Sequence, residues 1–136
     1  MIKFLNTLSD LQAQVSKWKL NRYRVGLVPT MGSLHDGHLS LLKIARKHCD
    51  KVVTSIYVNP QQFSASEDFD SYPRSIGEDL KKITRSNACD LVFKPNQMYH
   101  KNHTTQIVLN GVAQSLESDK RPHLFSGVSI IVLKLF

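Results

Sequence analysis

Two histidines three residues apart, His35 and His38, stand in the segment Pro29–His38, which reads PTMGSLHDGH. This segment follows a short apolar run, Val25–Val28, and comes before an amphipathic stretch. A strand, a tight loop containing glycine and a helix would place both imidazoles where the helix begins. Backbone N–H groups and the positive end of the helix dipole converge there, which favours a bound phosphate. The simplest chemistry for this arrangement is a reaction on ATP.

The residue types around the two histidines fit such a site. Gly32 permits the turn after the strand, and Gly37 lets a ligand or the backbone approach closely. Side chains three apart on a helical turn face the same way, and a protonated imidazole stabilises negative charge that grows on a phosphate. Two other interpretations stay open. The histidines could be neutral structural side chains, or they could bind a metal ion, although no third ligand is evident nearby.

A second candidate segment is Val58–Phe63, which reads VNPQQF. It comes just after a predicted strand, and in open parallel sheets ligands bind beyond the carboxyl ends of the strands. An amide side chain at this place can donate to a carboxylate or hydroxyl and accept from an amine. A simple turn with Asn59-Pro60 at its corner explains the segment equally well. The acidic and aromatic stretch Glu67–Arg74 that follows could be a lid, a contact between subunits or a solvated loop.

Hydrophobic periodicity predicts the elements that position these segments. Amphipathic helices are predicted over roughly 8–19, over 38–48 and from Ile76 through Ile83, with capping boxes at Ser9 and Ser75. Runs rich in β-branched or apolar residues predict strands over 25–29, 51–58 and 89–93. Strands that alternate with helices through right-handed crossovers form a parallel sheet, so we predict an α/β fold.

The C-terminal part is less regular. Thr104–Leu109 could be a strand, and residues 112–117 a short helix. After residue 124 the composition favours a strand, but the apolar residues recur at helical spacing, and we predict a helix because local propensity is the weaker signal. This helix would reach the last residue without a cap, and we therefore expect that the chain is cut.

Length and composition limit the classes of function. The 136 residues are enough for one domain, and their formal net charge of +7 favours acidic partners such as nucleotides. The basic residues are scattered without the aromatic spacing of an RNA-binding sheet, so no nucleic-acid partner is expected. No apolar run is long enough to cross a membrane, and no secretory signal is evident. Cys49 and Cys89 are expected to be free thiols in a cytoplasmic protein.

Several strings together closely resemble the pantothenate synthetase family, also called pantoate–β-alanine ligases. The family's order and spacing are matched by VPTMGSLHDGH (28–38), VTSIYVNPQQF (53–63), EDFDSYPRS (67–75), CDLVFKP (89–95) and RPHLFSGVSIIVLKLF (121–136). The H-x-G-H element alone is less specific, because it marks a broader superfamily of nucleotidyltransferases and class I aminoacyl-tRNA synthetases.

The resemblance implies a Rossmann-like nucleotide-binding domain with a parallel sheet flanked by helices, and an ATP-dependent condensation of (R)-pantoate with β-alanine. Pantoate's carboxylate would attack the α-phosphate of ATP to give pantoyl adenylate and pyrophosphate. The amine of β-alanine would then attack the adenylate and release pantothenate and AMP. Mg²⁺ is expected with the ATP phosphates. A homodimer without nucleic-acid or membrane partners is also expected.

The resemblance also implies roles for particular residues. His38 matches the family's catalytic histidine, and His35 would assist at the phosphates. Gln62 would bind pantoate and then help to orient β-alanine, while Pro29 and Thr30 would shape the substrate pocket. No protein ligand for a metal is implied. The ATP site would be lined by Met31, Gly32, Ser33, Leu34, His35, Asp36, Gly37 and His38.

The chain also departs from the family. Leu124 stands where the family usually has His, and Ser126 where it often has Arg. Family members are roughly twice as long and continue to a G-E-K-D-x-Q-Q element and a C-terminal domain that are absent here. We therefore expect residues 1–136 to be an incomplete N-terminal domain, truncated before its last strands, with weak or absent catalysis. The alternatives are another H-x-G-H nucleotidyltransferase, or a non-catalytic remnant that binds ligand or dimerises.

Overall fold

The computed structural model describes residues 1–111 and 117–136. The chain divides into two compact units, each built from two segments of sequence. The first unit contains Met1–Tyr57 and Pro73–Asn96, and the second contains Val58–Tyr72 and Gln97–Phe136. The helix predicted over 112–117 lies mostly outside the described residues.

Among the described residues of the first unit, the strands form one parallel sheet in the order β1-β4-β3-β2. These strands are β1 (Lys3–Leu5), β2 (Val25–Thr30), β3 (Lys51–Ile56) and β4 (Leu91–Phe93). The prediction of a parallel α/β sheet is confirmed. Strand β1 was not predicted, because its three residues carry no periodic signal and its pairing with β4 is a long-range contact.

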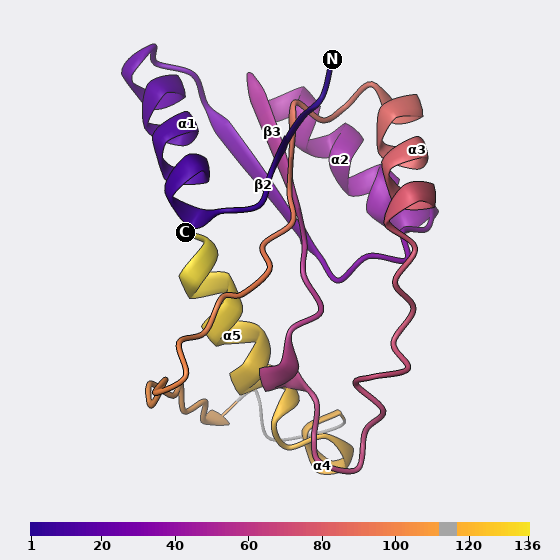
Figure 1. Ribbon diagram of the computed structural model, residues 1–136, viewed down its shortest axis with the longest axis vertical. Helices are drawn as coiled ribbons and strands as arrows, with labels where there is room; N and C mark the ends of the chain where they lie inside the picture. Colours follow the sequence, from indigo (N-terminus) through magenta and orange to yellow (C-terminus); the bar gives the residue numbers. More distant parts are fainter. Residues whose placement is uncertain (112–116) are drawn as a thin grey trace. The chain divides into compact units, whose positions relative to one another are not determined.

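Helices cover both faces of this sheet. The helices are α1 (Leu8–Leu20), α2 (Asp36–His48) and α3 (Ile76–Ser86), as predicted. The connections from β2 to β3 through α2 and from β3 to β4 through α3 run in one direction across the sheet, and the connection from β1 to β2 through α1 runs in the other. Because all of these connections are right-handed, α1 lies on the face opposite α2 and α3 (Figure 1). Strands β3 and β4 are therefore buried on both sides.

The predicted helix starts are wrong in detail. Helix α1 is capped by Thr7, whose hydroxyl accepts a hydrogen bond from the Asp10 amide at 3.2 Å, so the expected box at Ser9 does not form. Ser75 does precede α3, but its side chain makes no capping bond. Its backbone (φ −114°, ψ 55°) lies outside the extended region that an N-cap usually adopts.

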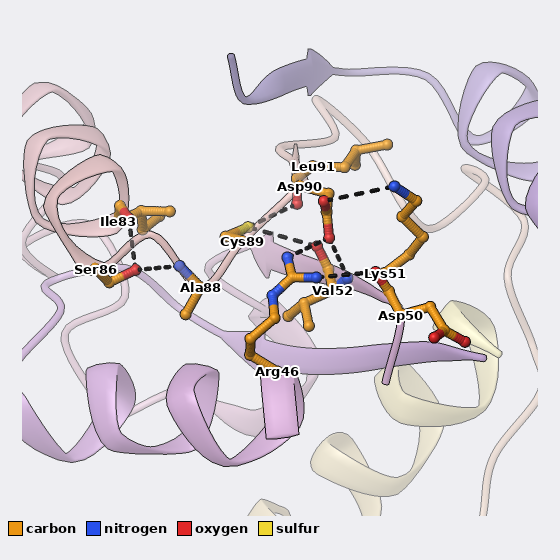
Figure 2. Close-up of polar contacts among 10 residues, drawn as sticks. All are labelled: Arg46, Asp50, Lys51, Val52, Ile83, Ser86, Ala88, Cys89, Asp90 and Leu91. Carbon is orange, nitrogen blue, oxygen red and sulfur yellow. Dashed lines mark hydrogen bonds and ion pairs between the residues drawn. The ribbon is translucent and has the colours of Figure 1, made fainter. Parts of the chain in front are cut away.

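One carboxylate joins α2 to the starts of the two central strands of the sheet. Asp90 accepts hydrogen bonds from Arg46 at 2.5 Å and from the Val52 amide at 2.7 Å (Figure 2). Lys51 adds an ion pair at 3.9 Å. Beside it, the buried Cys89 thiol donates to the Leu91 carbonyl at 3.2 Å. This group fixes the starts of β3 and β4, at the end of the sheet away from the carboxyl ends of the strands.

The second unit contains η1 (Pro60–Gln62), α4 (Glu117–Lys120) and α5 (Leu124–Leu135). The helix predicted from about residue 124 is confirmed, because its apolar positions at helical spacing outweigh the strand propensity of Ile130 and Ile131. The strand suggested for 104–109 is wrong: the segment has no regular structure and pairs with no strand among the described residues. Within the described part of the chain, every helix is too short or too polar to span a lipid bilayer.

Candidate functional site

His35 and His38 form a reciprocal cap at the beginning of α2. His35 is the N-cap residue, and its Nδ1 accepts the Gly37 amide at 3.1 Å. The His35 amide in turn donates to Nδ1 of His38 at 3.3 Å. The ring centroids lie 4.1 Å apart. The sequence predicted both imidazoles at this helix start, and the structure places them there in contact.

This capping determines which nitrogen of each ring is available to a ligand. Each Nδ1 uses its lone pair to accept a backbone N–H, so the proton of each neutral ring resides on Nε2. The pair therefore offers two Nε2–H donors at the positive end of a helix of 13 residues. Such donors suit an anion with several oxygen atoms.

Electrostatics in the site keep His38 neutral over a wider pH range than usual. Burial lowers its pKa below the ordinary 6.5, and the neighbouring His35 lowers that pKa further. The carboxylate of Asp79 opposes both effects and raises the pKa.

The position of the His35 ring against the backbone of residue 37 leaves no room for a side chain there. A Cβ at residue 37 would lie 2.8 Å from Cε1 and 3.0 Å from Nδ1 of His35. Any larger residue would push this imidazole away from the amide that it caps. The glycine of the H-x-G-H element thus serves the histidine that precedes it.

The loop between β2 and α2 is anchored at its start by Thr30. The Thr30 hydroxyl donates to the Ser55 carbonyl at 2.9 Å and accepts the Gly32 amide at 3.2 Å. Gly32 has φ +88°, a left-handed conformation in which glycine carries little strain. Ser33 follows at φ +51°, so two successive residues bend the chain away from the sheet toward α2.

Helix α3 holds the rest of this loop. Asp79, only 1% exposed, accepts the Ser33 amide at 2.9 Å and the Leu34 amide at 2.7 Å. Lys82 donates to the Leu34 carbonyl at 2.6 Å. This role for Asp79 was not identified from the sequence. The available signal was its place on the apolar face of α3 between Ile76 and Ile83, where a carboxylate needs a partner.

In the second unit, Gln62 belongs to a buried network of amides. Gln62 is 7% exposed, and its Oε1 accepts from Nδ2 of Asn59 at 3.1 Å. The same Nδ2 donates to the Gly127 carbonyl at 2.8 Å, and Oδ1 accepts from the Tyr99 hydroxyl at 2.8 Å. Asn59 therefore joins η1, α5 and the segment that contains Tyr99, and it holds the side chain of Gln62 in place.

The predicted site residues are thus divided between the units. Pro29–His38 form one continuous segment of the first unit, while Gln62 belongs to the second. Leu34 differs from its neighbours, because its side chain is in the core and both of its backbone groups are bonded to α3.

The two positions that depart from the family pattern, Leu124 and Ser126, both belong to α5. Leu124 begins this helix, and Ser126 lines a cavity of about 260 Å³ together with His123.

Comparison with known proteins identifies the family. The model of the pantoate-beta-alanine ligase family matches residues 3–136. The chain belongs to this family. Relatives include the pantothenate synthetases of Maricaulis maris, 46% identical over 99% of the chain, and of Mesorhizobium japonicum, 48% identical over 97%. The family resemblance inferred from the sequence strings is therefore confirmed.

Solved structures of the family share the fold. The pantothenate synthetase of Thermus thermophilus aligns with 99% of the chain at 37% identity and a TM-score of 0.87. The pantoate-beta-alanine ligase of Francisella tularensis, complexed with beta-gamma ATP and beta-alanine, aligns with 99% at 33% identity and a TM-score of 0.88. The chain spans about half the length of these proteins, at 48% and 52%, and 47% of both curated relatives.

Proposed function

We propose that this chain supplies the nucleotide-binding part of an ATP-dependent ligase that joins pantoate to β-alanine through pantoyl adenylate. Membership of the family supports the reaction class, and the complex of the Francisella tularensis enzyme supports ATP and β-alanine as ligands. The observation that carries the proposal for this chain is the reciprocal cap of His35 and His38. It leaves both Nε2–H groups available at a helix N-terminus.

Each residue has a distinct part in the proposed first step. His38 donates from Nε2 to the α-phosphate as pantoate's carboxylate attacks, and His35 donates to a neighbouring phosphate oxygen. Because both donors are already oriented, little reorganisation is needed as charge develops. Gln62 presents its amide to pantoate and later to β-alanine, and Asn59 restricts its rotation. Pro29 and Thr30 border the substrate.

Mg²⁺ would enter this site with the ATP phosphates. Both oxygens of Asp79 already accept amide hydrogens, whereas Asp36 in the first turn of α2 is exposed. Asp36 is therefore the carboxylate of this segment that fits an ion carried by phosphate, and the ion would neutralise phosphate charge. No group of three His, Cys, Asp or Glu side chains suited to a metal ion occurs in the described part of the chain.

Binding of ATP by the chain tests the nucleotide part of the proposal. Isothermal titration calorimetry with ATP and Mg²⁺ should give a saturable signal. His38→Ala should weaken the affinity for ATP at least roughly tenfold, the loss expected for one hydrogen bond to a charged group. His48→Ala is the matched control, because His48 lies at the other end of α2. Equal weakening by both variants, or no binding by the parent chain, would contradict the proposal.

Two alternative functions remain to be separated from this one. Another H-x-G-H nucleotidyltransferase would transfer the nucleotide to a different acceptor, and a non-catalytic remnant would only bind ligand or dimerise. Because residues 1–136 alone are expected to have weak or absent catalysis, turnover is measured on the chain extended to the family's full length. Release of pyrophosphate from ATP only when pantoate is added favours the ligase, and binding of pantoate without turnover by that extended chain favours the remnant. The expected homodimer is tested by sedimentation velocity.

A further inference from the structure

We propose that Asp79 and Lys82 of α3 are positioning residues that clamp the Gly32–Leu34 loop and thereby set the orientation of the His35/His38 pair. The link from this clamp to phosphate binding rests on the proposed function. The clamp itself concerns hydrogen bonds within the first unit and can be tested separately.

The first half of the clamp is a carboxylate that accepts two successive amides. Asp79 Oδ2 accepts from Ser33 at 2.9 Å, and Oδ1 accepts from Leu34 at 2.7 Å. At 1% exposure the carboxylate has little contact with water, so these bonds must replace its hydration. Hydrogen bonds to a charged acceptor are stronger than neutral ones. The bend after β2 is therefore fixed by α3, an element that follows it by more than forty residues.

The second half of the clamp is a cation that acts on the same peptide segment. Lys82 stands three residues after Asp79 on α3, so both side chains project from one side of the helix. Its ammonium donates to the Leu34 carbonyl at 2.6 Å. Leu34 is therefore held at both its N–H and its C=O, and its side chain is 2% exposed in the core. Residue 34 can neither rotate nor shift without breaking one of these contacts.

The fit between the loop and Asp79 is close. A Cβ at Gly32 would lie 3.1 Å from Asp79 Oδ2 and 3.3 Å from Ile56 Cγ2. The loop therefore passes between the end of β3 and the carboxylate with no room for a side chain. Together with the positive φ of Gly32 and Ser33, this leaves one path for the chain from β2 to α2.

The clamp reaches the histidines in two ways. Leu34 directly precedes His35, so the position of Leu34 sets where the capping ring begins. The charge of Asp79 also acts on His38, whose pKa it raises against the effect of burial. In addition, Asp79 occupies the amides of Ser33 and Leu34. A phosphate at this site would consequently be bound by the histidine Nε2–H groups and the first turn of α2, and not by these loop amides.

Matched substitutions on α3 test the clamp by NMR in the 136-residue chain. Asp79→Asn leaves one acceptor and turns an NH₂ group toward the other amide. Glu78→Gln removes the same charge from the neighbouring exposed position. We expect amide exchange at Ser33 or Leu34 to become roughly tenfold faster or more in the Asp79 variant and to stay unchanged in the Glu78 variant. Equal exchange in the two variants would overturn the proposal.

A second pair and a titration separate positioning from general stability. Lys82→Met should speed exchange at Leu34 relative to its exposed neighbour variant Lys81→Met. Asp79→Asn should also lower the pKa of His38, followed through its ring nitrogens, because an opposing charge is removed. An unchanged His38 titration in a folded Asp79 variant would refute the link to the histidines.

Measurements on the unsubstituted chain cover the case in which the Asp79 variant fails to fold. Scalar coupling across the hydrogen bonds from the Ser33 and Leu34 amides to the Asp79 carboxyl carbon should be detectable, and its absence for both would refute the clamp. ATP is then added to each folded variant. Weaker ATP binding by Asp79→Asn than by Glu78→Gln supports the link to phosphate. If the parent chain does not bind ATP, the proposed function fails. The amide exchange rates and the scalar couplings would still show whether the clamp exists.

Discussion

Replacement of Gly127 by alanine should destabilise the second unit. A Cβ at residue 127 would lie 2.5 Å from both the carbonyl carbon of Gln61 and Cα of Gln62, and closer still to the Gln61 oxygen. Ordinary van der Waals contacts begin near 3.4 Å. Because the atoms that would be met belong to the backbone, they cannot rotate away. Helix α5 and η1 would have to separate by about 1 Å.

Three effects combine to give the size of the change. Overpacking of this kind costs about 1–3 kcal/mol. The separation also stretches the bond from Asn59 to the Gly127 carbonyl, now 2.8 Å, which contributes about 1 kcal/mol. In the opposite direction, alanine favours a helix over glycine by about 1 kcal/mol. The clash and the lost bond exceed the gain in propensity, so we expect a net loss of about 2 kcal/mol.

Gly77→Ala is the matched control. Gly77 lies in α3, and no atom outside its chain neighbours and the backbone of its own helix stands within 4 Å of the position its Cβ would take. The same chemical change should therefore stabilise the chain by about 0.5–1 kcal/mol. Urea unfolding is followed by far-UV circular dichroism and by the fluorescence of Trp18, which reports on the first unit. A Gly127 variant as stable as the parent, or changes of equal sign in both variants, would refute the steric reasoning.

Three further predictions concern single groups. Because burial lowers the folded-state pKa of His38 below 6.5, the unfolded chain binds more protons there, and stability is lost as pH falls from 6.5 toward that lower value. The free energy of unfolding should be lower at about pH 5.5 than at about pH 7.5, and His38→Gln should make this difference between the two pH values smaller. Tyr99→Phe removes the hydrogen bond to Asn59 Oδ1 and should lower the free energy of unfolding, measured with urea, by about 1 kcal/mol. Asn59→Ala removes the partner of both the Gly127 carbonyl and the Tyr99 hydroxyl, so it should lower the free energy of unfolding by about 2–3 kcal/mol. Burial raises the pKa of the Cys89 thiol and hides it from solvent, whereas Cys49 is half-buried. A thiol reagent should therefore modify Cys49 in the folded chain and Cys89 only after unfolding. Mass spectrometry that finds Cys89 labelled first would contradict this prediction.

Local signals were sufficient for much of the fold. The apolar residues of α2 and α3 recur at helical spacing, and β3 is rich in β-branched residues, so these elements could be predicted from neighbouring residues alone. The helix α5 was predicted against its strand-like composition for the same reason. The segment 104–109 has strand composition but no partner among the described residues, and composition alone cannot supply the pairing that a strand requires.

The sequence by itself determined the family, the parallel α/β fold and the position of His35 and His38 at a helix start, because each depends on short strings, local periodicity or the handedness of crossovers. Only the tertiary structure decided that Asp79 and Lys82 hold the loop, that Asn59 fixes Gln62 and that Gly127 must lack a side chain. Each of these depends on residues that meet at specific distances, most of them far apart in the chain. The physical reason is that hydrogen bonds and steric contacts act over a few ångströms of space, whatever the separation in sequence.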